Sequence, residues 1–181
     1  VLDVGSGSGD IASEILKENL PISLYLLDLN EEMLLEGRKR LRKEKNIKYF
    51  IGNAEKLNFE NNFFDKYTIS FCLRNVTEYL LSIKEAYRVL KPGGKYCCLE
   101  FSTPKSSLIS SSYKIYKSKI LPLLGEIVAK DKNAYKYLSE SIDLFPSQEE
   151  LSKNLSDCGF TKVETINLFN GIVAIHTGYK I

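Results

Sequence analysis

A glycine-rich turn directly after a short apolar run constrains this chain more than any other feature. Glycines follow the run at the alternate positions Gly5, Gly7 and Gly9. Without Cβ atoms the backbone can turn tightly and approach a ligand there, just before a helix expected to begin near Asp10. The next apolar run ends about twenty residues later in Asp28, where a carboxylate at a strand tip suits the two hydroxyls of a ribose. The pattern predicts an α/β fold whose first two strands hold a nucleoside.

The glycine spacing discriminates between two adenosine-containing cofactors. A dinucleotide-binding turn has another glycine where this chain has Asp10, and a carboxylate there is poorly suited to a pyrophosphate on a helix N-terminus. S-adenosylmethionine has no phosphate and carries a sulfonium cation, so nearby carboxylates are compatible with it. The pattern favours S-adenosylmethionine, and the alternative is an ordinary glycine turn followed by a chance aspartate.

Composition narrows the class of protein. The 181 residues fit one domain, and 44% hydrophobic with 27% charged residues is typical of a soluble globular protein. The net charge of +2 gives no sign of nucleic-acid binding. The four cysteines lack metal-ligand spacing, and the adjacent Cys97 and Cys98 point to opposite faces of an expected strand. We therefore expect packing cysteines, no metal and a reducing, cytoplasmic compartment.

Short apolar runs alternate with helical patterns, which indicates a mostly parallel sheet with helices on both faces. The predicted strands lie near 1–4, 23–28, 47–51, 65–71, 95–101, 161–168 and 172–179, and the predicted helices near 10–19, 31–44, 77–90 and 148–158. The turn from Lys91 to Gly94 should end the third helix. Asn170-Gly171 predicts a two-residue hairpin, so the sheet should end in an antiparallel pair.

A segment of about 45 residues, from Ser102 to Pro146, breaks this alternation. Its length is typical of a lid or cap, and it follows a strand end at the edge where open α/β sheets bind ligands. It has helical patches near 113–124 and 134–144, and its aromatic residues are Tyr113, Tyr116, Tyr135, Tyr137 and Phe145. These aromatics either cover a ring or greasy chain or pack the insert onto the body. We expect a single domain over residues 1–181, with 102–146 as a substrate cap.

Two more strand ends carry polar residues. Asn53 follows the third run, in Gly52-Asn53-Ala54-Glu55, where its amide either bonds an adenine edge or caps a turn. The fourth run places Ser70 at the mouth of the cleft, ahead of the stretch Cys72-Leu73-Arg74-Asn75-Val76.

These segments together resemble the UbiE-type C-methyltransferases of ubiquinone and menaquinone synthesis. The resemblance rests on Asp3–Asp10, Asp28–Leu34, Gly52–Glu55, Ile69–Val76, Arg88–Gly94, Leu99–Ser102, Tyr135–Ile142, Cys158–Phe160 and Gly171–Lys180, and it covers essentially the whole chain. Many methyltransferases share the glycine loop, whereas the stretches from Leu73 to Val76 and from Tyr135 to Ile142 are specific to this family. The resemblance implies a Rossmann-like class I methyltransferase fold: a mostly parallel seven-stranded sheet, a C-terminal antiparallel hairpin and a helical insert before the last two strands.

The resemblance also implies a cofactor, a substrate and site residues. S-adenosylmethionine would methylate a ring carbon of a prenylated demethylquinol, with cofactor contacts from Gly5, Gly7, Ser8, Asp28, Asn53, Ala54 and Ser70. The ring carbon is nucleophilic only when the ring hydroxyl is at least partly ionised. Arg74, which stays protonated, is expected to face the phenolate oxygen as a fixed cation or to hold a water that takes the proton. Asn75 would orient Arg74 or that water; the alternative is that both residues only cap the loop.

Several residues depart from the family's pattern. Ser6 and Ser8 stand where glycine and threonine are common, and Cys72 stands where glycine is usual, which should narrow the cleft. Val1 lies inside the first expected strand, so we expect the given sequence to begin partway through a longer protein. The family's N-terminal segment ahead of that strand is absent from it, and without this segment the cofactor pocket would lose part of its cover.

Other candidates are weaker. His176 is the only histidine, but its apolar strand favours a structural role, and Glu140 and Asp131 are weak acid–base candidates. Two rival functions remain: a non-catalytic methyltransferase-fold subunit that binds quinone-pathway partners, and a methyltransferase for another small molecule or for RNA, the last disfavoured by the near-neutral charge. The sequence leaves open a benzoquinol or naphthoquinol ring, peripheral contact with a membrane, and a homodimer.

Overall fold

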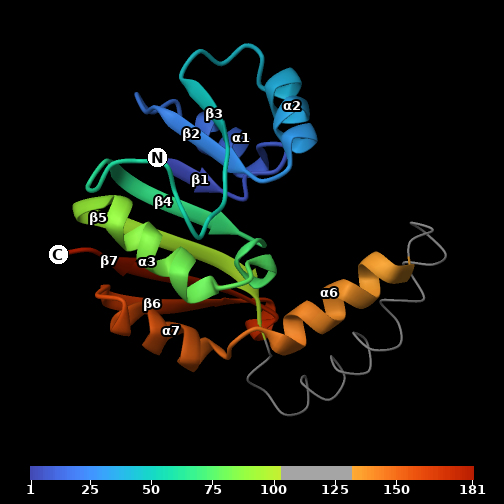
Figure 1. Ribbon diagram of the computed structural model, residues 1–181, viewed down its shortest axis with the longest axis vertical. Helices are drawn as coiled ribbons and strands as arrows, with labels where there is room; N and C mark the ends of the chain where they lie inside the picture. Colours follow the sequence, from blue (N-terminus) through green and yellow to red (C-terminus); the bar gives the residue numbers. More distant parts are fainter. Residues whose placement is uncertain (103–131) are drawn as a thin grey trace.

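The computed structural model describes residues 1–102 and 132–181. Its seven strands form one sheet with the order β3-β2-β1-β4-β5-β7-β6 (Figure 1). The strands are β1 (Leu2–Val4), β2 (Leu24–Asp28), β3 (Ile47–Ile51), β4 (Phe64–Ser70), β5 (Leu90–Phe101), β6 (Thr161–Leu168) and β7 (Val173–Tyr179). The pairs from β3 to β5 are parallel, and β7 is antiparallel to both of its neighbours. The predicted mixed sheet with a reversed C-terminal strand is confirmed.

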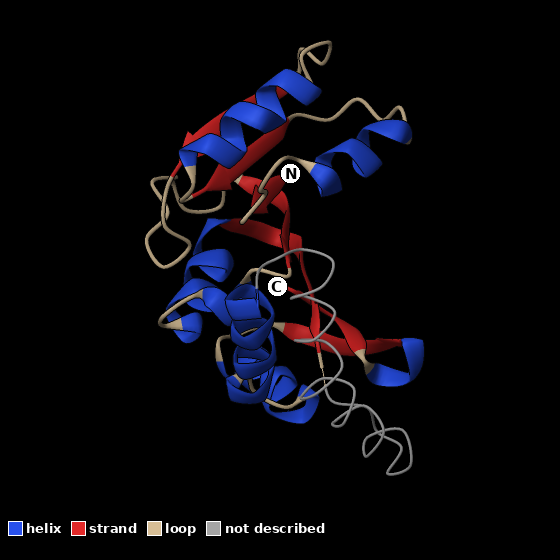
Figure 2. Cartoon of the chain, turned by 90° about the vertical axis from the view of Figure 1, so that its right-hand side faces the viewer, coloured by secondary structure: helices blue, strands red, loops and turns tan. Residues whose placement is uncertain are grey.

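Helices cover both faces of the sheet (Figure 2). They are α1 (Asp10–Lys17), α2 (Glu31–Arg40), α3 (Tyr79–Val89), α6 (Lys132–Leu144) and α7 (Gln148–Asp157), with short 3-10 turns η1 (Leu73–Asn75) and η4 (Phe169–Gly171). Leu26 of β2 packs into the cluster with α1 and α2, while its neighbour Leu27 packs into the cluster with α3 and α7. Among the described residues, no helix combines the length and apolar character needed to cross a bilayer.

Local chemistry explains where helices begin and end. The Asn30 side chain accepts hydrogen bonds from the backbone N–H groups of Glu32 and Met33, at 2.9 and 3.2 Å, and so starts α2 just after the tip of β2. Basic side chains in the last turn of α2 complement the helix dipole. Ser147 caps α7 in the same way, by accepting from the Glu150 N–H at 3.2 Å.

The predicted strands and helices lie close to the observed ones, but the last turn differs. The predicted two-residue hairpin at Asn170-Gly171 is wrong: pairing of β6 and β7 ends at Leu168 and Val173, so four residues connect them. Phe169 and Asn170 both have positive φ, at 48° and 56°. Residues in a β-strand have negative φ, so neither residue continues the pairing of β6 with β7. The predicted helix near 134–144 is present as α6, whereas the one near 113–124 lies outside the described residues.

Candidate functional site

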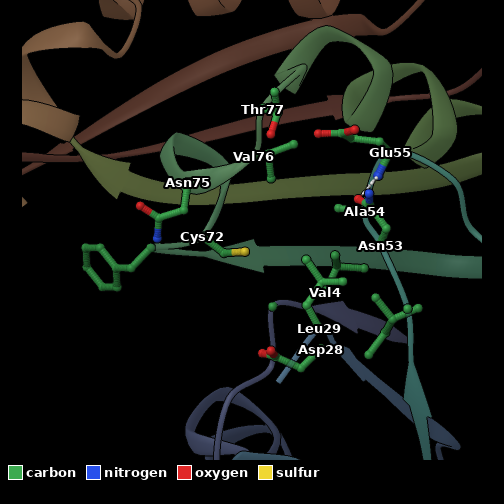
Figure 3. Close-up of a pocket in the computed structure, with 14 residues that line it drawn as sticks. Val4, Asp28, Leu29, Asn53, Ala54, Glu55, Cys72, Asn75, Val76 and Thr77 are labelled. Atoms are coloured by element: carbon green, nitrogen blue, oxygen red, sulfur yellow. Dashed lines mark hydrogen bonds between the residues drawn. The ribbon is translucent and has the colours of Figure 1, made fainter. Parts of the chain in front are cut away.

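A pocket of about 350 Å³ opens at the carboxyl ends of β1, β2 and β4 (Figure 3). It is lined by Val4, Gly5, Leu27, Asp28, Leu29, Gly52, Asn53, Ala54, Glu55, Phe71, Cys72, Asn75, Val76 and Thr77. The lining therefore comes from the glycine turn, the tips of β2 and β3, and the loop after β4. Open α/β sheets bind ligands at this edge, and the pocket lies where the sequence predicts the cofactor site.

Backbone hydrogen bonds fix the carboxylate of Asp28 at the pocket wall. The Gly7 N–H donates to Oδ2 and the Asn30 N–H donates to Oδ1, each at 2.8 Å. Each carboxylate oxygen keeps a further lone pair. A carboxylate oriented in this way can accept hydrogen bonds from two neighbouring hydroxyls, as the ribose prediction requires.

The first glycine of the turn has no room for a side chain. Gly5 has φ +64°, and a Cβ atom on it would lie 2.2 Å from the sulfur of Cys72. Burial, reinforced by nearby Asp28 and Glu100, raises the pKa of the Cys72 thiol to about 11. Cys72 is therefore a neutral packing group over the turn and not a nucleophile.

The loop after β3 combines turn capping with pocket lining. Asn53 Oδ1 accepts a hydrogen bond from the Glu55 N–H at 2.9 Å, and Glu55 Oε1 accepts one from the Glu78 N–H at the start of α3, also at 2.9 Å. These bonds fix the loop, while Asn53, Ala54 and Glu55 line the pocket (Figure 3). The Asn53 amide nitrogen thus remains suited to an adenine edge even though its oxygen caps the turn.

Arg74 and Asn75 are adjacent in sequence but face different surroundings. Asn75 lines the pocket, whereas Arg74 Nη1 donates to Glu100 Oε1 at 2.7 Å and to the Phe71 carbonyl at 2.6 Å. Only 10% of the Arg74 side chain and 2% of the Glu100 side chain are exposed. Burial raises the pKa of Glu100, and the charge of Arg74 opposes that rise.

The partner of Arg74 differs from the expected phenolate. Glu100 neutralises the charge of the guanidinium inside the protein. The backbone N–H of Phe101 also donates a hydrogen bond to Glu100 Oε1, at 2.8 Å, and fixes the carboxylate at the end of β5. Sequence reasoning missed Glu100, although a carboxylate inside an apolar strand needs a buried cation nearby, and that requirement is a readable signal. Phe71, Val76 and Thr77 of the pocket were also missed.

Three predicted cofactor residues, Gly7, Ser8 and Ser70, do not line this pocket. The Ser8 hydroxyl donates to Asp10 at 3.3 Å, and the Asp10 carboxylate also pairs with Arg40. Ser70 lies on the same face of β4 as Thr68, because side chains alternate along a strand, whereas the buried Ile69 between them faces the α3 cluster. Gly7 contributes through its backbone bond to Asp28.

The only histidine is structural, as expected. His176 is 2% exposed on β7, and its Nε2 lies 3.2 Å from the Gln148 carbonyl oxygen. Burial lowers its pKa, so the ring is neutral near pH 7. Of the weaker acid–base candidates, Asp131 lies outside the described residues, and Glu140 is exposed on α6 and does not line the pocket.

Solved structures share this fold at low sequence identity. Phosphoethanolamine N-methyltransferase 2 of Haemonchus contortus, in complex with S-adenosyl-L-methionine, aligns with a TM-score of 0.73 at 17% identity, over 99% of this chain and 48% of that one. A SAM-dependent methyltransferase of Aquifex aeolicus aligns with a TM-score of 0.71 at 18% identity, over 99% of this chain and 81% of that one. Both support the class I methyltransferase fold.

Sequence relatives are far more similar. The ubiquinone/menaquinone biosynthesis C-methyltransferase UbiE of Rickettsia prowazekii (strain Madrid E) is 50% identical over 188 aligned positions, which cover 100% of this chain and 76% of the relative. The protein of the same name from Rickettsia bellii (strain RML369-C) is 48% identical with the same coverage. The family model described as the ubiE/COQ5 methyltransferase family matches residues 1–180. This chain belongs to the ubiE/COQ5 methyltransferase family.

Proposed function

We propose that this chain transfers a methyl group from S-adenosylmethionine to a ring carbon of a prenylated demethylquinol in ubiquinone or menaquinone biosynthesis. Family membership over residues 1–180 supports the enzyme class, and relatives about half identical to it are named for that reaction. The structural observation that carries the proposal is the Asp28 carboxylate, which two backbone N–H groups hold at the pocket wall.

The pocket residues fit S-adenosylmethionine. Asp28 would accept hydrogen bonds from the ribose hydroxyls, and Asn53 with Ala54 would border the adenine. Gly5 lines the same pocket, and because it has no Cβ the Cys72 side chain can pack directly over the turn. When bound, S-adenosylmethionine supplies a methyl group from a sulfonium sulfur, which keeps the bonding electrons and becomes a thioether.

The chain's own residues must favour the ionised ring and align its carbon. Loss of the ring hydroxyl proton makes the carbon nucleophilic, and the carbon's own proton leaves to water after the new bond forms. Asn75 lines the pocket on the side of the loop after β4, and we assign its amide as a donor to one of the two ring oxygens, which helps to align the ring. Arg74, held by Glu100, then positions the turn that carries Asn75.

The insert 102–146 is assigned as the substrate cap. In its described part, α6 packs against η1, and Tyr137 of α6 bonds Asn75 of η1. Exposed apolar side chains at α6, at η4 and after β4 further suggest where a lipid substrate enters: Leu144 is 87% exposed, Phe169 78% and Phe71 38%. We include peripheral contact with a membrane through these residues in the proposal.

Calorimetry and turnover assays separate this function from its rivals. We expect heat on titration with S-adenosylmethionine, and methylated product from a reduced demethylquinol of the benzoquinol or the naphthoquinol class. A non-catalytic fold remnant would show no turnover with either ring. A methyltransferase for another molecule would bind S-adenosylmethionine but leave both quinols unchanged, and that result would contradict the assigned substrate.

A further inference from the structure

A hydroxyl group of the cap helix reaches the amide that lines the pocket. The Tyr137 hydroxyl of α6 donates a hydrogen bond to Asn75 Oδ1, with the two atoms 3.2 Å apart. The two residues are 62 positions apart in sequence, but α6 packs against η1, the turn that carries Asn75. Figure 1 shows α6 extending from the body of the protein near one end of the sheet. Asn75 itself lies beside Cys72 at the pocket (Figure 3).

Only certain atoms of Tyr137 and Asn75 remain able to hydrogen-bond a ligand. Asn75 Oδ1 is occupied by Tyr137, whereas Asn75 Nδ2 has no partner among the residues that the structure describes. The hydrogen of the Tyr137 hydroxyl is committed to Asn75, so its oxygen can only accept. The Tyr137 side chain is accessible, because the residue is 55% exposed. The pair therefore offers one donor and one acceptor side by side.

A phenolic hydroxyl on a ring matches that arrangement. Its oxygen accepts from Asn75 Nδ2, and its hydrogen is donated to the Tyr137 oxygen. In a quinol this is the hydroxyl that keeps its proton, while the second ring hydroxyl is the one that ionises. A quinone carbonyl or a methyl ether can accept from Asn75 but has no hydrogen for Tyr137, so the tyrosine oxygen is left without its partner. A site built to bond a hydroxyl rejects an analogue that lacks it more strongly than an apolar pocket would.

We propose that Tyr137 is a substrate-positioning and specificity residue, which together with Asn75 selects the reduced, hydroxylated ring over the oxidised quinone. The inference rests on the proposed function of this pocket and extends it to the redox state of the substrate. No proton transfer to Tyr137 is involved, because its hydroxyl stays bonded to Asn75 and the tyrosine only accepts a hydrogen bond.

Substitution of the hydroxyl alone tests the role of Tyr137. Tyr137→Phe should lower kcat/KM for the quinol about tenfold, the effect of losing one hydrogen bond in a binding site, with unchanged affinity for S-adenosylmethionine. Tyr179→Phe is the matched control, because it removes a tyrosine hydroxyl where β7 pairs with Lys95, at the other end of the sheet. This control variant should have the parent's kcat and KM.

Inhibition by ring analogues separates recognition from simple anchoring of α6. The parent should bind the hydroxylated ring about tenfold more tightly than its methyl ether or its quinone, and Tyr137→Phe should bring that ratio close to one. In an Asn75→Ala background the same substitution should change kcat/KM less than about twofold, because its partner is gone.

The opposite results are equally distinct. An active parent whose Tyr137→Phe variant keeps full preference for the hydroxylated ring overturns this inference alone. A variant that loses affinity for S-adenosylmethionine in step with turnover also overturns it, since Tyr137 would then be a structural anchor. A parent that binds S-adenosylmethionine but neither binds nor methylates the quinols overturns the proposed function and this inference together.

Discussion

At the scale of single residues, Asp28 carries the cofactor assignment. Asp28→Ala removes the proposed charged acceptor for the ribose hydroxyls, so calorimetry should show a loss of about 1–3 kcal/mol in the binding of S-adenosylmethionine. Asp65→Ala is the matched control, because it removes a carboxylate that pairs with Lys91 at the amino end of β4. The control should bind like the parent; equal affinity of Asp28→Ala and the parent would exclude Asp28 from the site.

Arg74 tests whether positioning or direct charge stabilisation dominates. Arg74→Ala leaves the carboxylate of Glu100 buried without its cation, which should cost about 3–5 kcal/mol in the free energy of unfolding. Displacement of the η1 turn should lower turnover on the order of a hundredfold. Arg74→Lys should keep part of the activity because it keeps a cation beside Glu100, and neither variant should change the affinity for S-adenosylmethionine.

The pH dependence of Arg74→Ala distinguishes the two roles. If Arg74 acted directly on the phenolate, activity would recover as the pH approached the pKa of the phenol, because solvent would then supply the ionised ring. The pairing with Glu100 predicts no such recovery, since a misplaced Asn75 is not repaired by ionising the substrate. Recovery of turnover at high pH would therefore show that Arg74 acts directly on the phenolate as a catalytic cation.

The sequence predicts pocket-lining residues well where the local backbone determines the position of the residue. It does not predict the direction of a side chain that depends on a partner far away in the sequence. Gly5, Asp28 and Asn53 follow directly from strand ends and turn chemistry, and all three line the pocket. The direction of the Arg74 side chain depends on Glu100, which is 26 positions away and lies on β5. Spacing along the sequence carries no information about such a pair.

At the scale of elements, α6 is the described part of the proposed substrate cap, and its response to substrate can be measured. The bond from Tyr137 to Asn75 and the packing of α6 on η1 couple this helix to the pocket. Binding of a quinol analogue should therefore slow hydrogen exchange of the α6 backbone amides. If protection changes only around the glycine turn, the assignment of 102–146 as the substrate cap is wrong.

Element prediction was accurate for periodic segments and weaker for connections. The runs of β2 and β3 alternate between the two core clusters, so their positions follow from the sequence. β5 begins earlier than expected because Leu90 already pairs with Phe64 ahead of a register shift, and the β6–β7 connection is longer than its Asn-Gly signal implied. Both differences depend on where strand pairing stops, which neighbouring strands determine.

At the scale of the whole molecule, a buried carboxylate makes stability depend on pH. Asp3 of β1 is 1% exposed, and burial raises its pKa from the ordinary 3.8 to about 7 despite a hydrogen bond from Thr68 at 2.8 Å. The folded protein thus holds a proton that the unfolded chain gives up above about pH 4. Its stabilising effect is complete below that pH and is lost as the pH rises towards 7.

Asp3→Asn removes this dependence because an amide stays neutral and can still accept from Thr68. Between about pH 5 and pH 8, the free energy of unfolding of the parent should fall relative to that of the variant by up to a few kcal/mol, at about 1.4 kcal/mol per unit of pKa difference. Denaturant titrations across that range measure the difference. Parallel stability profiles would show that Asp3 titrates alike in the folded and unfolded states.

The most direct test of the central claim is the position of the transferred methyl group. The chain is incubated with S-adenosylmethionine carrying a deuterated methyl group and with a reduced demethylquinol, and the product is analysed by mass spectrometry and NMR. We expect one labelled methyl group bonded to a ring carbon, with both ring hydroxyls intact. A label on a ring oxygen, or unlabelled quinol from a protein that binds S-adenosylmethionine, would contradict it.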